Sequence, residues 1–377
     1  MSLKLPVKGV QLFPNSVNRL HQIDALRGLA AILVIIAHAS ESLAPIATQY
    51  GHSSMLAQFA QRADVGRIGV VIFFIISGFV VAHALGGRDA TLAKFAVRRF
   101  FRLYPLYWLS IVLVIFYPGT GKYPLAPQGD HSALLANVTM LPTLLGFEPM
   151  MGIYWTLETE LVFYLCAVVF YQTGQLFKPI ALFWIIFALI GVFAAVMFGV
   201  LPAPRLLSWK SLPLNLAFMF WGALFHAVVF NRALQANRGK WKYLLLISAG
   251  LILLPSAYTF IRFFSSHSPD DLRWAVSYPA AVLGFTLIFF AKGRWTQRVS
   301  GLGVISYSMY LLHPLAFAMV TSFLRSHAID GGMASLPFMT TVTIGIAVAL
   351  SIMSYLLLEK PCIFLGRKLT AKFAHAT

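Results

Sequence analysis

Charged residues are scarce in this sequence and make up only 11% of its 377 residues. In soluble domains the share averages about 25%. Hydrophobic residues make up 59% of the chain, and the mean hydropathy is +0.78. Because so much apolar surface cannot face water, these values exclude an ordinary soluble domain and predict a polytopic membrane protein.

Cysteine is almost absent. Cys166 lies in an apolar stretch and Cys362 lies near the C-terminus, so the sequence offers neither a disulfide framework nor zinc-ligand spacing. The histidines show no metal-ligand spacing either, and we expect no metal. Phosphate-loop, Gly-x-Ser-x-Gly and His-Glu-x-x-His motifs are also missing. The first 22 residues lack the long apolar core of a cleavable signal peptide.

Acidic residues are few, and the formal net charge is +17. The basic residues cluster between hydrophobic stretches, which is how membrane proteins set their orientation, so we expect no nucleic-acid partner. With the N-terminus in the cytoplasm, 21 of the 29 Lys and Arg residues fall on the inner side. This bias predicts cytoplasmic termini and an even number of spans.

Long hydrophobic runs dominate what is present. They predict an all-α polytopic transmembrane helix bundle of about ten spans, forming one domain over residues 1–377. One connection on the outer side, roughly 119–153, is long enough to contribute to binding. The predicted spans are 24–45, 66–86, 102–118, 154–172, 179–200, 212–230, 243–262, 273–291, 303–324 and 337–358.

Two ionisable residues mark the first span. Arg27 stands near its inner end and His38 lies in its interior. Both fall within about 20° of one helix face and roughly 16.5 Å apart along the axis. The structural interpretation is an arginine anchor and a packed histidine. The functional interpretation is a bound phosphate at Arg27 and a general base at His38, and the residues alone leave both open.

A cluster of arginines precedes the third span. Arg98 and Arg102 share a helical face, with Arg99 beside them. The cluster can lie on anionic lipid headgroups or bind phosphate groups through bidentate guanidinium contacts. Glu359, at the inner end of the last span, is expected to pair with an arginine at this edge.

The fourth span is expected to begin from the outer side with Tyr154 and Trp155. Glu160 enters the apolar helix and needs a partner, and His38 is a candidate. Glu41, one turn outward of His38, is an alternative partner, although its position favours a solvated charge at the helix end. Glu158 is expected to be a solvated interfacial charge.

The ninth span carries a polar stripe of Ser306, Tyr310 and His313 on one face. The stripe can line a cavity or hold helices together through hydrogen bonds, and by itself it favours packing. In the second span, Ser77 and Gly78 allow close approach of a neighbouring helix.

Several of these stretches together resemble the integral-membrane acyltransferase-3 family. Each is weak alone, but they occur in the family's order across nearly the whole chain. They are the Arg27–His38 pair with ten residues between, Gly69–Val80, Arg98–Trp108, Trp155–Tyr164, Ser306–Pro314 and Glu359–Pro361.

The resemblance implies transfer of an acyl group, commonly acetyl, from a cytoplasmic coenzyme A thioester to a hydroxyl of a surface polysaccharide, lipid-linked glycan or small molecule. It implies His38 and Glu160 as catalytic residues, and Arg27, Arg98, Arg99 and Arg102 as the donor site. Tyr154, Trp155, Ser306, Tyr310 and His313 are expected to line the site. The resemblance also implies the bacterial inner membrane, with membrane lipid as a partner.

Two other function classes fit the residues. A transporter or flippase of a lipid-linked glycan would also have about ten spans and buried ionisable residues. A structural partner in a polysaccharide assembly complex would need neither Arg27 nor His38 beyond stability. The oligomeric state, the acyl chain and the acceptor are not fixed by the sequence.

Overall fold

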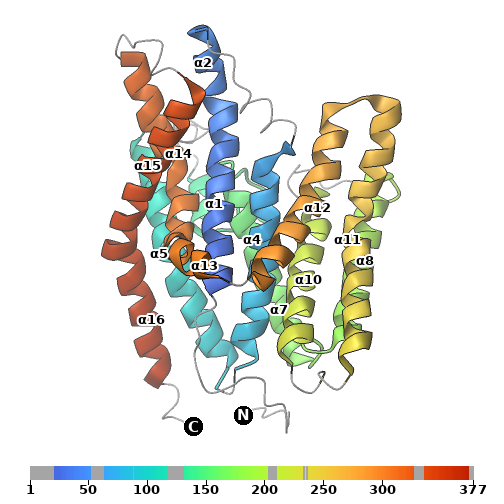
Figure 1. The fold of residues 1–377 in the computed structure, drawn as a ribbon. Helices are drawn as coiled ribbons and strands as arrows, with labels where there is room; N and C mark the ends of the chain where they lie inside the picture. The colour runs from blue at the N-terminus through green and yellow to red at the C-terminus, as the bar shows by residue number, and fades with distance from the viewer. Residues whose placement is uncertain are drawn as a thin grey trace. The chain divides into compact units, whose positions relative to one another are not determined.

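The computed structural model describes residues 21–51, 63–87, 89–117, 131–202, 210–231, 234, 237–291, 293–326 and 335–372. These residues form helices and connecting turns, with no strand among them, as the sequence predicts (Figure 1). The helices are α1 (His21–Ser42), α2 (Ala44–Gln49), α4 (Val65–Leu85), α5 (Leu92–Phe116), α6 (Ser132–Val138), α7 (Tyr154–Gln172), α8 (Pro179–Met197), α10 (Leu212–Phe230), α11 (Arg238–Ser266), α12 (Pro269–Phe290), α13 (Arg294–Val304), α14 (Ser306–Ser326), α15 (Leu336–Ser354), the π-helical turn η2 (Tyr355–Glu359) and α16 (Lys360–Lys372).

Within the described ranges, nine helices are long and apolar enough to cross a membrane. All ten predicted spans coincide with a helix, but α7 is not among the nine. Its first two turns carry two glutamates and two threonines, which lower its hydropathy. Proline occupies one of the first two positions of α8, α10, α12 and α15, where its missing N–H has no helical partner to lose.

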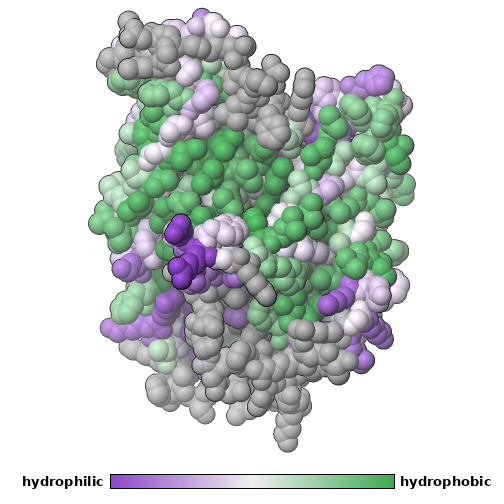
Figure 2. Space-filling model, in the orientation of Figure 1, coloured by the Kyte–Doolittle hydropathy of each residue, from purple (hydrophilic) through white to green (hydrophobic). Residues whose placement is uncertain are grey.

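Two helices begin at residues other than the predicted starts of their spans in a way that changes the architecture. The span expected at 102–118 begins earlier, at Leu92, because the arginine-rich stretch continues the helix beyond the apolar residues. The span expected at 303–324 starts at Ser306, and the residues before it form the separate helix α13. This short helix is amphipathic, and a hydrophilic patch lies over it in Figure 2, formed by exposed Arg294, Gln297 and Arg298.

The chain divides into two compact units. The smaller unit contains the described parts of Phe74–Phe95 and Val162–Ile252. Its helices meet at glycines: a Cβ on Gly78 would lie 1.7 Å from the backbone oxygen of Met219, and one on Gly222 would lie 2.0 Å from that of Ile75. The close approach predicted at Gly78 is therefore confirmed.

The larger unit contains the described parts of Leu20–Phe73, Ala96–Leu161 and Leu253–Thr377. In it α1 packs against α13, α14 and α15, which surround α1 in Figure 1. Ala31, Ile35 and Ala39 recur at every fourth position of α1 and are fully buried against Met309 and Ala316 of α14. This spacing puts small and branched side chains on one helix face, where they fill the seam between α1 and α14.

Close contact between α1 and α13 also depends on glycine. A Cβ on Gly303 would lie 2.0 Å from the backbone oxygen of Asp24, and one on Gly28 would lie 2.6 Å from Cβ of Leu302. The two backbones thus approach more closely than any larger residue permits.

We therefore expect Gly303→Ala to destabilise the protein by about 1–3 kcal/mol, because the added methyl group overlaps backbone atoms that cannot move aside independently. The matched control is Gly301→Ala in the same helix, where no atom lies within 4 Å of the new Cβ. Thermal unfolding in detergent measures both. Equal melting temperatures for the two variants would contradict the close packing of α1 on α13.

Candidate active site

Two histidines from distant parts of the chain contact each other in the larger unit. Nδ1 of His38, on α1, lies 2.9 Å from Nε2 of His313, on α14. The ring centroids are 5.0 Å apart. His313 is fully buried, whereas His38 is half-buried. We call these residues the histidine pair.

The surroundings of His313 fix the proton positions in the histidine pair. Nδ1 of His313 lies 2.7 Å from the backbone oxygen of Tyr310 and 3.3 Å from that of Met309. Both oxygens only accept hydrogen bonds, so Nδ1 of His313 carries a proton. In the neutral ring, Nε2 of His313 is then an acceptor, and Nδ1 of His38 donates to it. Nε2 of His38 is left with a free lone pair, which is what a general base or nucleophile requires.

The polar stripe on α14 holds helices together, which is the packing role that the sequence favoured. The hydroxyl of Tyr310 lies 2.7 Å from Oγ1 of Thr156 and donates to the backbone oxygen of Ile153 at 3.1 Å. Ser306 donates to the backbone oxygen of Gly303. Together with His313, the stripe therefore connects α14 to α1 and to the start of α7.

Glu160 was the carboxylate expected to act on His38, but other carboxylates act on it in the structure. The charges that act on His38 are those of Glu41 and Asp64, whereas Glu160 acts on Arg27 and on the tyrosines of α14. Glu41 was the alternative partner considered from the sequence. The hydrogen-bond partner that the structure records for His38 is His313, and a catalytic role for Glu160 stays a prediction.

A second charged group lies around the arginines of α5. Nη1 of Arg102 lies 3.8 Å from Oε1 of Glu359, whose side chain is completely buried. The other carboxylate oxygen of Glu359 accepts a hydrogen bond of 2.8 Å from Ser308. The predicted pairing of Glu359 with an arginine is thereby confirmed.

The 3.8 Å contact between Arg102 and Glu359 is longer than a hydrogen bond. Oε1 of Glu359 has no hydrogen-bond partner, and Glu359 closes the π-helical turn η2. Single π-helical turns occur often at functional sites, because the inserted residue changes the direction of a side chain. The charges of Arg102, Asp24, Glu160 and Glu359 all act on Arg27. The predicted donor-site arginines Arg27 and Arg102 are thus close enough to interact.

The other two arginines lie farther along the same helix edge. Arg98 is exposed and its Nε donates to Oγ1 of Thr370 at 3.1 Å, and Arg99 is half-buried. These guanidinium groups have the charge and the fork of donors that phosphate oxygens bind. The four predicted donor-site residues all belong to the larger unit, and their binding of a donor stays a prediction.

The start of α7 contains one wrong prediction. Glu158 is not a solvated charge: it is 2% exposed and accepts a hydrogen bond of 2.9 Å from the backbone N–H of Leu144. The carboxylate is buried because it holds the chain that precedes α7. Tyr154 is also buried, with its hydroxyl 2.8 Å from Oγ of Ser110 on α5, and Trp155 is half-buried.

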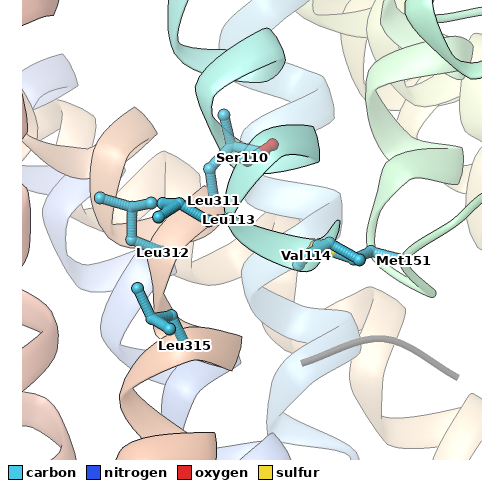
Figure 3. A pocket seen from close by; sticks show the side chains of 7 residues that line it. All are labelled: Ser110, Leu113, Val114, Met151, Leu311, Leu312 and Leu315. Carbon is cyan, nitrogen blue, oxygen red and sulfur yellow. The ribbon is translucent and has the colours of Figure 1, made fainter. Parts of the chain in front are cut away.

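A small apolar hollow lies beside α14 (Figure 3). Leu311 and Leu315 of α14 border it, and they lie on one helix face because they are four residues apart. His313 is two residues from each, about 200° around the helix. The hollow therefore lies on the side of α14 away from the histidine pair. Its walls are Ser110, Leu113, Val114, Met151, Leu311, Leu312 and Leu315.

Sequence reasoning found both histidines but did not pair them. Their positions are 275 residues apart, and no spacing rule relates α1 to α14. The only feature of the sequence that could have suggested the pairing was that both histidines were expected in the interior of membrane spans. Among the described residues, no group of three or more His, Cys, Asp or Glu side chains could hold a metal ion.

Comparison with known proteins identifies an acyltransferase family and relatives that include named acyltransferases. A family model described as "Acyltransferase domain" matches residues 20–356. Acyltransferase MdmB of Streptomyces mycarofaciens is 25% identical over 94% of this chain and 95% of its own length. Exopolysaccharide production protein ExoZ of Rhizobium meliloti is 26% identical over 80% of this chain and 91% of its own. Peptidoglycan O-acetyltransferase OatA of Listeria monocytogenes is 26% identical over 80% of this chain and half of its own length. No solved structure matches the chain.

The proton positions in the histidine pair can be measured without substrate. We expect nitrogen NMR of histidine-labelled protein to show His38 and His313 both protonated at Nδ1. The backbone oxygen of Tyr310 requires a proton on Nδ1 of His313, and the acceptor Nε2 of His313 then requires a proton on Nδ1 of His38. The spectrum of His38→Ala identifies the signals of His38, and His267→Asn, an exposed position, is the control. A proton on Nε2 of His38 would contradict this arrangement.

Proposed function

This chain belongs to the acyltransferase-domain family, and we propose that it moves an acetyl group from cytoplasmic acetyl-coenzyme A to a hydroxyl of a surface polysaccharide or its lipid-linked precursor. The chain is an integral membrane acyltransferase that transfers groups other than amino-acyl groups. The donor, the acceptor and the bacterial inner membrane as its location are parts of the proposal.

The observation that carries the proposal is the 2.9 Å contact between Nδ1 of His38 and Nε2 of His313, from which we infer a free lone pair on Nε2 of His38. His313 donates to a backbone oxygen and accepts from His38, so it orients the ring as the acid of a catalytic triad does. A neutral imidazole in this state takes up a proton from a hydroxyl near neutral pH. The half-buried position of His38 leaves the ring partly accessible.

In the proposed reaction, the acceptor oxygen attacks the thioester carbonyl, the new C–O bond forms and the C–S bond breaks. His38 takes the hydroxyl proton on Nε2 and returns it to the departing sulfur. The same lone pair also suits a route in which His38 briefly carries the acyl group.

The arginines of the larger unit support a donor with phosphate groups. Arg102 pairs with Glu359 at 3.8 Å, the positive charge of Arg27 is close enough to repel that of Arg102, and Arg98 and Arg99 precede Arg102 on α5. Arg27 is eleven residues before His38 on the same helix, roughly 16.5 Å along the axis. The pantetheine arm of coenzyme A has about this reach, so its phosphates at Arg27 place the thioester near His38.

The relatives support a carbohydrate acceptor. ExoZ is named for exopolysaccharide production and OatA for peptidoglycan O-acetylation. We propose an acceptor of this class, with the outer connection 119–153 and Trp155 selecting it. Residues 118–130 of that connection lie outside the described residues.

A transporter or flippase of a lipid-linked glycan is the competing function. Family membership favours the enzyme, and catalytic turnover decides between them. A protein with only a structural role in an assembly complex would not transfer acetyl groups itself. In that case, replacing His38 would change the stability of the protein and no rate of acetyl transfer.

The first functional prediction concerns His38. We expect His38→Ala to lower acetyl transfer by at least about 100-fold, which is the contribution of a general base. Purified protein in lipid, labelled acetyl-coenzyme A and a glycan acceptor are the assay, and His267→Asn should keep wild-type activity. Full activity of folded His38→Ala would overturn the proposal.

The second concerns Arg102. We expect Arg102→Lys to raise KM for acetyl-coenzyme A about tenfold with little change in kcat, because lysine keeps the charge beside Glu359 and loses the bidentate fork. Arg294→Lys on α13 is the control, since Arg294 is exposed. An unchanged KM would make Arg102 a topology signal only.

A further inference from the structure

The segment before α7 lies along α5. The side chains of Tyr104 and Trp108 donate to the backbone oxygens of Thr139 and Val138, each at 3.0 Å. Tyr107, which is fully buried, donates to the backbone oxygen of Asn137 at 2.7 Å. Three α5 side chains within two turns therefore hold three successive backbone carbonyls.

The position of these contacts along α5 gives their depth. The part of α5 after Arg102, Leu103–Phe116, carries no charged residue and is about 21 Å long. Trp108 lies about 9 Å from Arg102, near the middle of this part. The chain passes the end of α5 at Phe116, and at Asn137 it is again beside Tyr107, about 14 Å back along the helix. The segment has returned to the depth of the apolar stretch.

Internal hydrogen bonds satisfy several polar groups of this segment, although the buried hydroxyl of Thr143 has no partner among the described residues. The buried side chain of Asn137 donates to the backbone oxygens of Ala133 and Glu148 and accepts from the backbone N–H of Met150. Glu158 accepts from the N–H of Leu144. Irregular backbone at membrane depth is stable only when its hydrogen bonds are made inside the protein, and these contacts meet that condition.

Large apolar side chains face outward from the middle of this segment, whereas the exposed ionisable residues His131 and Glu148 flank it. Leu135 is 65% exposed, and Leu144 and Leu145 are each 52% exposed. No charged residue occurs from Ser132 to Phe147. In water this surface would be unfavourable, since each buried leucine gains about 1.5–3 kcal/mol relative to exposure. Next to hydrocarbon it is the surface expected.

We propose that Ser132–Phe147 is a re-entrant segment whose Leu135, Leu144 and Leu145 contact lipid acyl chains inside the bilayer. The helix α7 then begins within the membrane, beside Ser110, and not at its outer surface. This explains why α7 is not among the helices able to cross a membrane on their own. The segment also places the backbone oxygen of Ile153 where Tyr310 binds it, three residues before His313.

Electron paramagnetic resonance of spin-labelled protein in liposomes tests the depth without substrate, so its outcome is independent of the proposed function. The label is placed at Leu144→Cys, or at Leu145→Cys if the first variant does not fold, after Cys166→Ser and Cys362→Ala. Leu283→Cys, exposed on the spanning helix α12, is the lipid reference, and Gln49→Cys, exposed on α2, is the water reference.

We expect the label at 144 or 145 to relax with oxygen, which dissolves in lipid, and to lose relaxation by a water-soluble nickel complex, as at position 283. Relaxation by nickel as strong as at position 49 would show a water-exposed outer loop and overturn the proposal. Labels at 144 and 145 that give opposite results would also overturn it, because adjacent residues of an embedded tip lie at similar depth.

Discussion

The constraint on which this structure depends is that polar groups within a bilayer cannot be satisfied by water. An unpaired polar group in an apolar medium costs about 2–7 kcal/mol. The larger unit meets this constraint by pairing polar groups across helices. His38 pairs with His313, and Ser308 pairs with Glu359. Each pair joins two helices, so the hydrogen bonds that remove the penalty also define the arrangement of the helices.

The same constraint shapes the chemistry of the histidine pair. A histidine held by a carboxylate would bring a second buried charge into the membrane. His313 is neutral when it accepts from His38, and its own proton goes to a backbone oxygen that Tyr310 already provides. The ring of His38 is thereby oriented without a buried ion.

Close helix packing supplies the precision that the histidine pair requires. Gly303 and Gly28 bring α13 against α1, and the alanines of α1 fit the surface of α14. Since lipid is as apolar as the helix surfaces, association depends on small residues and interhelical hydrogen bonds. A shift of about 1 Å at these contacts would break a hydrogen bond of 2.9 Å between the two rings.

The sequence by itself determined the class of the protein, the existence of its helices and the residues that carry charge inside them. Hydropathy depends on composition within a window, so α8 and α10 could be located from their residues alone. It failed where helices continue past apolar residues, as at Leu92, and where a charge is buried by a distant segment, as Glu158 is by Leu144. Only the tertiary structure decided that His38 meets His313 and that Asn137 returns to the level of Tyr107. Local pattern fixes which face of a helix is polar, but the partner of that face depends on how distant helices pack, and no residue spacing encodes it.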